Sequence, residues 1–109
     1  MRNIKWLETA ERELQNIIQY VSEAFGSDFA SRIVDDIMLR VEALGEFPYL
    51  GTIDSSIQFQ GLVLYILHER HLRIYYTVTE KEILIVLLWN NQRDDHLLVT
   101  AIETALRKT

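Results

Sequence analysis

The chain has 109 residues, of which 49% are hydrophobic and 25% charged, and it has no cysteine, so a globular protein is expected and disulfides and thiolate metal sites are excluded. Its formal net charge of −5 at pH 7 disfavours direct, sequence-specific DNA binding, because phosphate contacts need a basic surface. The length predicts a single domain over residues 1–109, and the longest apolar run, Ile83–Trp89, is far shorter than the roughly 18 residues of a membrane span.

The N-terminal half predicts a strand followed by two helices. The first residues lack the apolar stretch of a secretory signal, so we expect a cytoplasmic protein with no membrane partner. Ile4–Leu7 predicts a short first strand. Apolar residues at helical spacing then predict amphipathic helices over Ala10–Phe25 and Phe29–Leu44. Because Gly26 ends the first helix without steric cost, the two helices are expected to form an antiparallel hairpin.

The ends and the buried face of this hairpin can also be predicted. Thr9 is the expected cap of the first helix, and Ser27 or Asp28 that of the second, since their side chains accept hydrogen bonds from unpaired N–H groups. Phe25 and Met38 are expected in the core, as large apolar side chains usually are.

A proline-containing joint follows the hairpin. Pro48 cannot continue the helix and pushes Phe47 toward an extended conformation. We expect Phe47, Tyr49 and Leu50 to pack the joint against the core, and Thr52–Ser56 to form a polar loop.

The C-terminal half predicts a sheet and a last helix. Strands are expected at Phe59–Leu67, Leu72–Val78 and Ile83–Trp89, and their short polar connections predict an antiparallel meander. Asp94 is the expected cap of a short C-terminal helix, Leu97–Ala105. The fold class is therefore α+β. Strands this apolar on both faces predict a sheet covered by the hairpin on one side, and either the last helix or another chain covers the other.

Short motifs in a fixed order run through nearly the whole chain. They are Trp6 before the first helix; Ala10, Leu14, Ile17-Ile18 and Tyr20-Val21 within it; Ala30, Ile33 and Ile37 in the second; Leu44-x-x-Phe47-Pro48-x-x-Gly51 at the joint; Arg73-Ile74-Tyr75-Tyr76-Thr77-Val78; and Ile83 to Leu88 running into Arg93-Asp94. Their order and spacing resemble the RelE/ParE superfamily of bacterial type II toxin–antitoxin (plasmid stabilisation) toxins.

The resemblance implies a partner and two alternative activities. The partner is a cognate antitoxin encoded alongside, which wraps the toxin and masks it. RelE-like members cut messenger RNA in the ribosomal A site, whereas ParE-like members bind and poison DNA gyrase without hydrolysing anything. No cofactor is expected, and no metal site either, because His68-x-x-His71 is one pair of potential ligands without a second pair.

A nuclease site needs cations that hold the phosphate, together with an acid and a base. RelE-like toxins supply these groups from their strands and C-terminus. The corresponding catalytic set here is Arg73, Arg93 and His96, with Glu69 or His71 as the base. If the chain is not a nuclease, these groups are structural or solvated. Arg73 would then pair with Asp35 or Asp36, and Arg93 with one of the two aspartates that follow it.

The choice between a ParE-like and a RelE-like toxin depends on cations that the predicted sheet lacks. Many family members carry arginine or lysine on the first meander strand, where this chain has Leu62 and Val63. The two long helices also match the ParE-like branch. We therefore favour a ParE-like toxin that acts by binding a target such as DNA gyrase. A RelE-like ribosome-dependent mRNA endonuclease and a non-toxic, toxin-derived interaction module are the alternatives.

Overall fold

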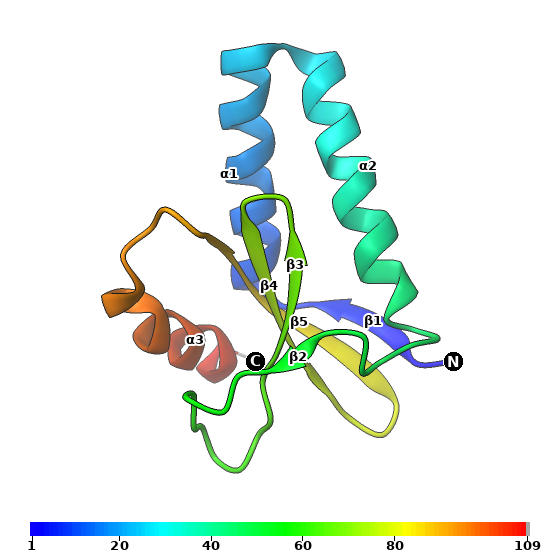
Figure 1. Cartoon of the computed structure of the whole chain (residues 1–109), viewed down its shortest axis with the longest axis vertical. Helices are drawn as coiled ribbons and strands as arrows, with labels where there is room; N and C mark the ends of the chain where they lie inside the picture. Colours follow the sequence, from blue (N-terminus) through cyan, green and yellow to red (C-terminus); the bar gives the residue numbers. More distant parts are fainter. Residues whose placement is uncertain (109) are drawn as a thin grey trace.

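Helices lie against both faces of one mixed sheet in a computed structural model that describes residues 1–108 (Figure 1). In chain order the elements are β1 (Asn3–Trp6), α1 (Glu8–Phe25), α2 (Ser27–Ala43), β2 (Thr52–Ile53), β3 (Tyr65–Glu69), β4 (Leu72–Val78), β5 (Glu82–Asn90), a 3-10 turn η1 (Asp95–Leu97) and α3 (Leu98–Arg107). The strand order is β1-β5-β4-β3-β2. β1 runs parallel to β5 and the other neighbours are antiparallel, so the α+β prediction and the meander are confirmed.

The helical hairpin is confirmed, but its predicted caps are wrong. Gly26 ends α1 with φ 96°, and α2 begins at the next residue. α1 begins one residue before Thr9, whose buried hydroxyl has no hydrogen-bond partner among residues 1–108. The cause is the preceding strand: the Leu7 N–H donates to the Ile85 carbonyl at 2.9 Å, so strand pairing rather than a side chain fixes the first turn.

Two apolar layers form the core, one on each face of the sheet. The layer beneath the hairpin contains Ala10, Ile37, Val41, Leu44, Leu67, Ile74, Tyr76, Ile83, Ile85 and Leu88. The layer beneath α3 contains Leu7, Ile57, Leu64, Tyr75, Val86, Leu87, Trp89, Leu98, Ile102 and Ala105. The chain's own C-terminal helix therefore covers the second face. Asp94 caps the turn that leads into it, accepting from the His96 N–H at 2.9 Å.

A bulge in β5 explains how consecutive residues reach the same layer. Tyr75 pairs with Leu87 and Tyr76 pairs with Ile85, so Val86 has no partner of its own on β4. Val86 and Leu87 both face α3 as a result.

The predicted strand Phe59–Leu67 is wrong in its first half. β3 begins at Tyr65, and Phe59 forms only an isolated bridge with Leu62. Between them Gln60 and Gly61 have φ of 51° and 77°, which turns the chain sharply. Ile57, Phe59 and Leu64 are buried in this loop, whereas Val63 is exposed.

The proline joint is held by a tyrosine rather than by its own apolar side chains. The Tyr76 hydroxyl donates to the Pro48 carbonyl and accepts from the Gly51 N–H, both at 2.9 Å. Phe47, Tyr49 and Leu50 are exposed, so the prediction that they pack into the core is wrong. The polar loop predicted after the joint contains β2, a short edge strand paired with β3.

Within residues 1–108, no helix is both long enough and apolar enough to span a bilayer.

Candidate functional site

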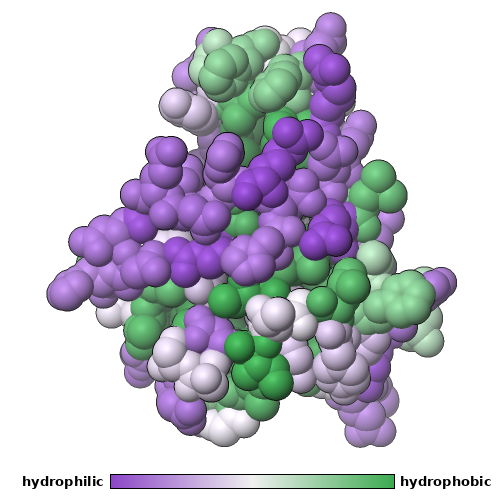
Figure 2. All heavy atoms as spheres, in the orientation of Figure 1, coloured by the Kyte–Doolittle hydropathy of each residue, from purple (hydrophilic) through white to green (hydrophobic). Residues whose placement is uncertain are grey.

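A groove of about 770 Å³ opens between the helical hairpin and the adjoining ends of β4 and β5. Its lining comprises Glu13, Asn16, Ile17, Tyr20, Val21, Phe25, Phe29, Ile33, Arg70, His71, Leu72 and Asn90. Apolar side chains gather at the end of the hairpin in Figure 2, with hydrophilic ones across the middle of that face. The groove therefore combines an apolar wall with a polar rim.

Three aromatic side chains on the helices make this wall accessible. Tyr20 is 69% exposed, Phe25 65% and Phe29 39%, and the Phe25 and Phe29 ring centroids lie 5.5 Å apart. The prediction that Phe25 belongs to the core is wrong, because the hairpin extends past the sheet and its end has nothing to pack against (Figure 1). Met38 is half-buried.

The charged rim formed by the β3–β4 turn is neutralised by α2. Arg40 lies 3.3 Å from a carboxylate oxygen of Glu69, and Arg70 lies 3.8 Å from its other oxygen. Arg70 also donates to Asp36. Glu69, one of the two predicted bases, is thus held by two guanidinium groups, and the exposed His71 lines the groove beside them.

Arg73 points to the end of β5 and is surrounded by acceptors. Its Nη2 donates to Asp95 Oδ1 at 2.6 Å and its Nη1 to Oδ2 at 3.2 Å, a two-pronged pair. Nη1 also reaches the Tyr75 hydroxyl at 3.2 Å, and Nε reaches Asn91 Oδ1 at 3.0 Å. The alternative in which Arg73 pairs with Asp35 or Asp36 is therefore wrong.

Arg93 caps the same cluster from the following loop. Its Cζ lies 4.1 Å from the centroid of the Trp89 ring, and its Nη1 lies 3.7 Å from Glu13 Oε1 on α1. The predicted pairing of Arg93 with a following aspartate is wrong, because Asp95 is occupied by Arg73 and by the Trp89 indole N–H at 3.2 Å. Trp89 and Asp95 thus connect the two predicted arginines.

His96, the third predicted residue, follows Asp95 but is not brought into the cluster. It is exposed, and its imidazole makes no hydrogen bond within residues 1–108. In the same part of the chain, no three His, Asp or Glu side chains are arranged to hold a metal ion.

Charge pairing shifts the titration of this cluster. The hydrogen bond from Arg73 lowers the pKa of Asp95 below its usual value of 3.8 and raises the pKa of the Arg73 guanidinium. Burial raises the pKa of the Tyr75 hydroxyl. Asp95 is therefore ionised throughout the neutral range.

The lowered pKa of Asp95 gives an expected pH dependence of folding. Its contribution to stability is complete above pH 3.8, its unfolded value, and is lost as the pH falls through the lower folded value. We expect Asp95→Asn to reduce the drop in urea unfolding midpoint between pH 6 and pH 3. Asp35→Asn, at an exposed position, is the matched control, and an equal effect of both variants would contradict the assignment.

Sequence reasoning missed several members of the site. Tyr75 lies two residues from Arg73 on one strand, a spacing that places both side chains on the same face, so it was detectable. The exposed Tyr20 and Phe25 carried no local signal that separated them from core residues.

Comparison with known proteins adds two findings. Residues 4–95 match the model of a family described as the ParE toxin of the type II toxin–antitoxin system, parDE. A solved structure described as the chromosomal ParDE TA system from P. aeruginosa is similar with a TM-score of 0.66 and 23% sequence identity, covering 83% of this chain and 96% of that chain. No curated protein sequence matches the chain. At this identity the structural likeness shows the fold alone.

Proposed function

Because this chain belongs to the ParE toxin family of type II toxin–antitoxin systems, we propose that it acts by binding a bacterial protein target, DNA gyrase, and that a cognate antitoxin neutralises it. The observation that carries the proposal is the engagement of Arg73, whose guanidinium already donates to Asp95, Tyr75 and Asn91.

A phosphate ligand would have to compete for the guanidinium groups. Arg73 would exchange a two-pronged carboxylate for a phosphate, leaving Asp95 without its charge partner. Arg93 would leave the Trp89 face and Glu13. Cleavage needs cations that are free to follow the charge as it develops, and these two arginines are already neutralised. This favours binding over hydrolysis.

The groove is the proposed antitoxin site. The apolar wall extends along α1 from Ile17 to Phe25. A wall of this length can contact several apolar side chains on one face of an amphipathic helix. Glu13, which pairs with Arg93, and Arg70, which pairs with Asp36 and Glu69, give the wall a polar rim. Masking of this wall by the antitoxin would remove the most exposed aromatic side chains from solvent.

Two parallel assays with purified protein test the target. We expect inhibition of gyrase supercoiling with accumulation of cleaved DNA, and no new 3′ ends on a message translated in a cell-free system. Codon-spaced, ribosome-dependent 3′ ends would overturn the proposal. Absence of both effects, together with normal growth on expression in cells, would support the third alternative, an inert interaction module.

The exposed imidazole of His96, which has no hydrogen-bond partner among the described residues 1–108, favours one second candidate, the ribosome-dependent mRNA endonuclease. In that case Arg73 and Arg93 would hold the phosphate and His96 would act as acid or base. Under the proposal of gyrase binding, His96→Gln is expected to leave gyrase inhibition within about twofold of the parent protein, because most exposed polar side chains contribute little to binding. A nuclease would instead lose about 100-fold in message cleavage.

A further inference from the structure

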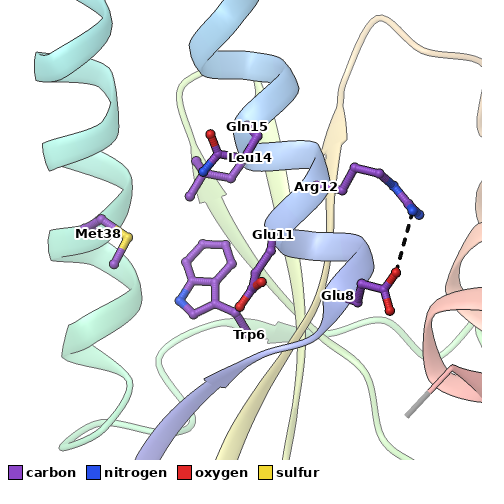
Figure 3. Close-up of a pocket in the computed structure, with 7 residues that line it drawn as sticks. All are labelled: Trp6, Glu8, Glu11, Arg12, Leu14, Gln15 and Met38. Atoms are coloured by element: carbon purple, nitrogen blue, oxygen red, sulfur yellow. Dashed lines mark ion pairs between the residues drawn. The ribbon is translucent and has the colours of Figure 1, made fainter.

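A second depression, of about 460 Å³, lies on the other side of the hairpin from the groove. It is lined by Trp6, Glu8, Glu11, Arg12, Leu14, Gln15 and Met38 (Figure 3). On α1, positions 11 and 15 project about 180° away from positions 13, 17 and 20, which line the groove. The two concavities are therefore separate sites.

This depression places an aromatic side chain, Trp6, beside a carboxylate, that of Glu11. Figure 3 shows the Trp6 indole between α1 and α2, with the Glu11 carboxylate next to it and Met38 on the α2 side. Within residues 1–108, the Glu11 carboxylate has no hydrogen bond or ion pair, and no cation lies over the Trp6 ring. Arg12 is directed away from the indole, toward Glu8 at 3.9 Å.

The chain's other tryptophan shows which group completes such an arrangement. The Trp89 ring carries the Arg93 guanidinium at 4.1 Å, and that guanidinium also approaches Glu13 at 3.7 Å. Trp6 and Glu11 reproduce the ring and the carboxylate without the guanidinium. We propose that this depression binds an arginine side chain presented by a partner protein.

Charge and shape favour arginine over other occupants. Residues 1–50 carry nine Asp and Glu against five Lys and Arg, a net charge of −4, which attracts a cation and repels phosphate. A planar guanidinium stacks on an indole face while its edge donates to a carboxylate, whereas an ammonium is a compact, strongly hydrated charge. The thioether of Met38 adds a polarisable, adaptable wall.

The probe is the blocked peptide acetyl-Gly-Arg-Gly-amide, compared with its citrulline counterpart, which has nearly the same shape and no charge. Each is titrated into the full chain while the two indole N–H signals are followed by NMR. We expect the arginine peptide to shift the Trp6 signal, saturating with a Kd on the order of millimolar, and to leave the signal of the fully buried Trp89 unchanged. Trp6→Phe assigns the signals and keeps an aromatic ring in place.

Matched charge variants separate this site from general attraction to an acidic protein. Glu11→Gln is expected to weaken peptide binding about three- to fivefold. Glu42→Gln makes the same charge change at an exposed position of α2 outside the depression and is expected to leave binding unchanged. An equal shift of Trp6 by the citrulline peptide would overturn the proposal, as would equal weakening by both variants. Neither outcome bears on the proposed action on gyrase.

Discussion

Replacing Gly51 with alanine is expected to lower the free energy of unfolding by about 2–4 kcal/mol, measured by urea denaturation. An added Cβ would lie 2.5 Å from the Ile66 carbonyl oxygen and 2.8 Å from the Tyr76 hydroxyl. Both neighbours are held in place, Ile66 by pairing with β2 and β4 and Tyr76 by its hydrogen bonds to the joint. Relief of the clash would therefore have to break β3 pairing or release the joint.

Gly26→Ala provides the contrast for this experiment. Chain neighbours aside, no atom of residues 1–108 lies within 4 Å of an added Cβ at Gly26, so only the strain of its φ of 96° remains. With a ψ of 161°, this backbone lies in a region essentially restricted to glycine, so the strain is expected to cost about 1–3 kcal/mol. A Gly51→Ala variant no less stable than Gly26→Ala would show that the joint accommodates a side chain, contrary to the geometry described.

The double variant Tyr20→Ser, Phe25→Ser is expected to weaken antitoxin binding by about 100-fold or more, because exposed aromatic anchors in a concave site carry most of the binding free energy. Both side chains are more than 60% exposed, so their removal leaves the core intact. The affinity is measured by calorimetry with the proposed cognate antitoxin, and the fold by circular dichroism.

Leu39→Ser is the matched control for the groove. Leu39 is 69% exposed on α2 and does not line the groove, so its replacement removes a comparable exposed apolar side chain elsewhere. Antitoxin affinity that falls equally in the control and in the double variant would place the interface outside the groove. Retained affinity in the double variant would do the same.

The elements that could be predicted from the sequence are those in which one pattern decides the structure. Residues of α1 and α2 follow helical spacing over four turns or more, and β4 and β5 are apolar runs bounded by short polar turns. The segment from Phe59 to Leu64 is equally apolar but lies in a loop. Phe59 and Leu64 are buried in this loop, and burial alone produces the same apolar pattern as a buried strand.

The sequence singled out the charged members of the candidate site but not their partners or the aromatic wall. Arg73 and Arg93 could be singled out because charges are rare near the ends of apolar strands. Their partners could not, since Asp95 reaches Arg73 only through the turn after β5, and Glu13 comes from a helix 80 residues earlier in the chain. The aromatic wall of the groove was missed because helical periodicity identifies an apolar face but not how far the hairpin projects past the sheet.

The parallel pairing of β1 with β5 sets the order in which the protein assembles during synthesis. Asn3 pairs with Glu82 and Trp6 with Ile85, so the first strand has no neighbour until the last one has been translated. At about 5–20 residues per second, several seconds separate these strands, during which only local structure such as the hairpin is able to form. A nascent chain therefore carries the two helices that line the groove before it has a completed sheet.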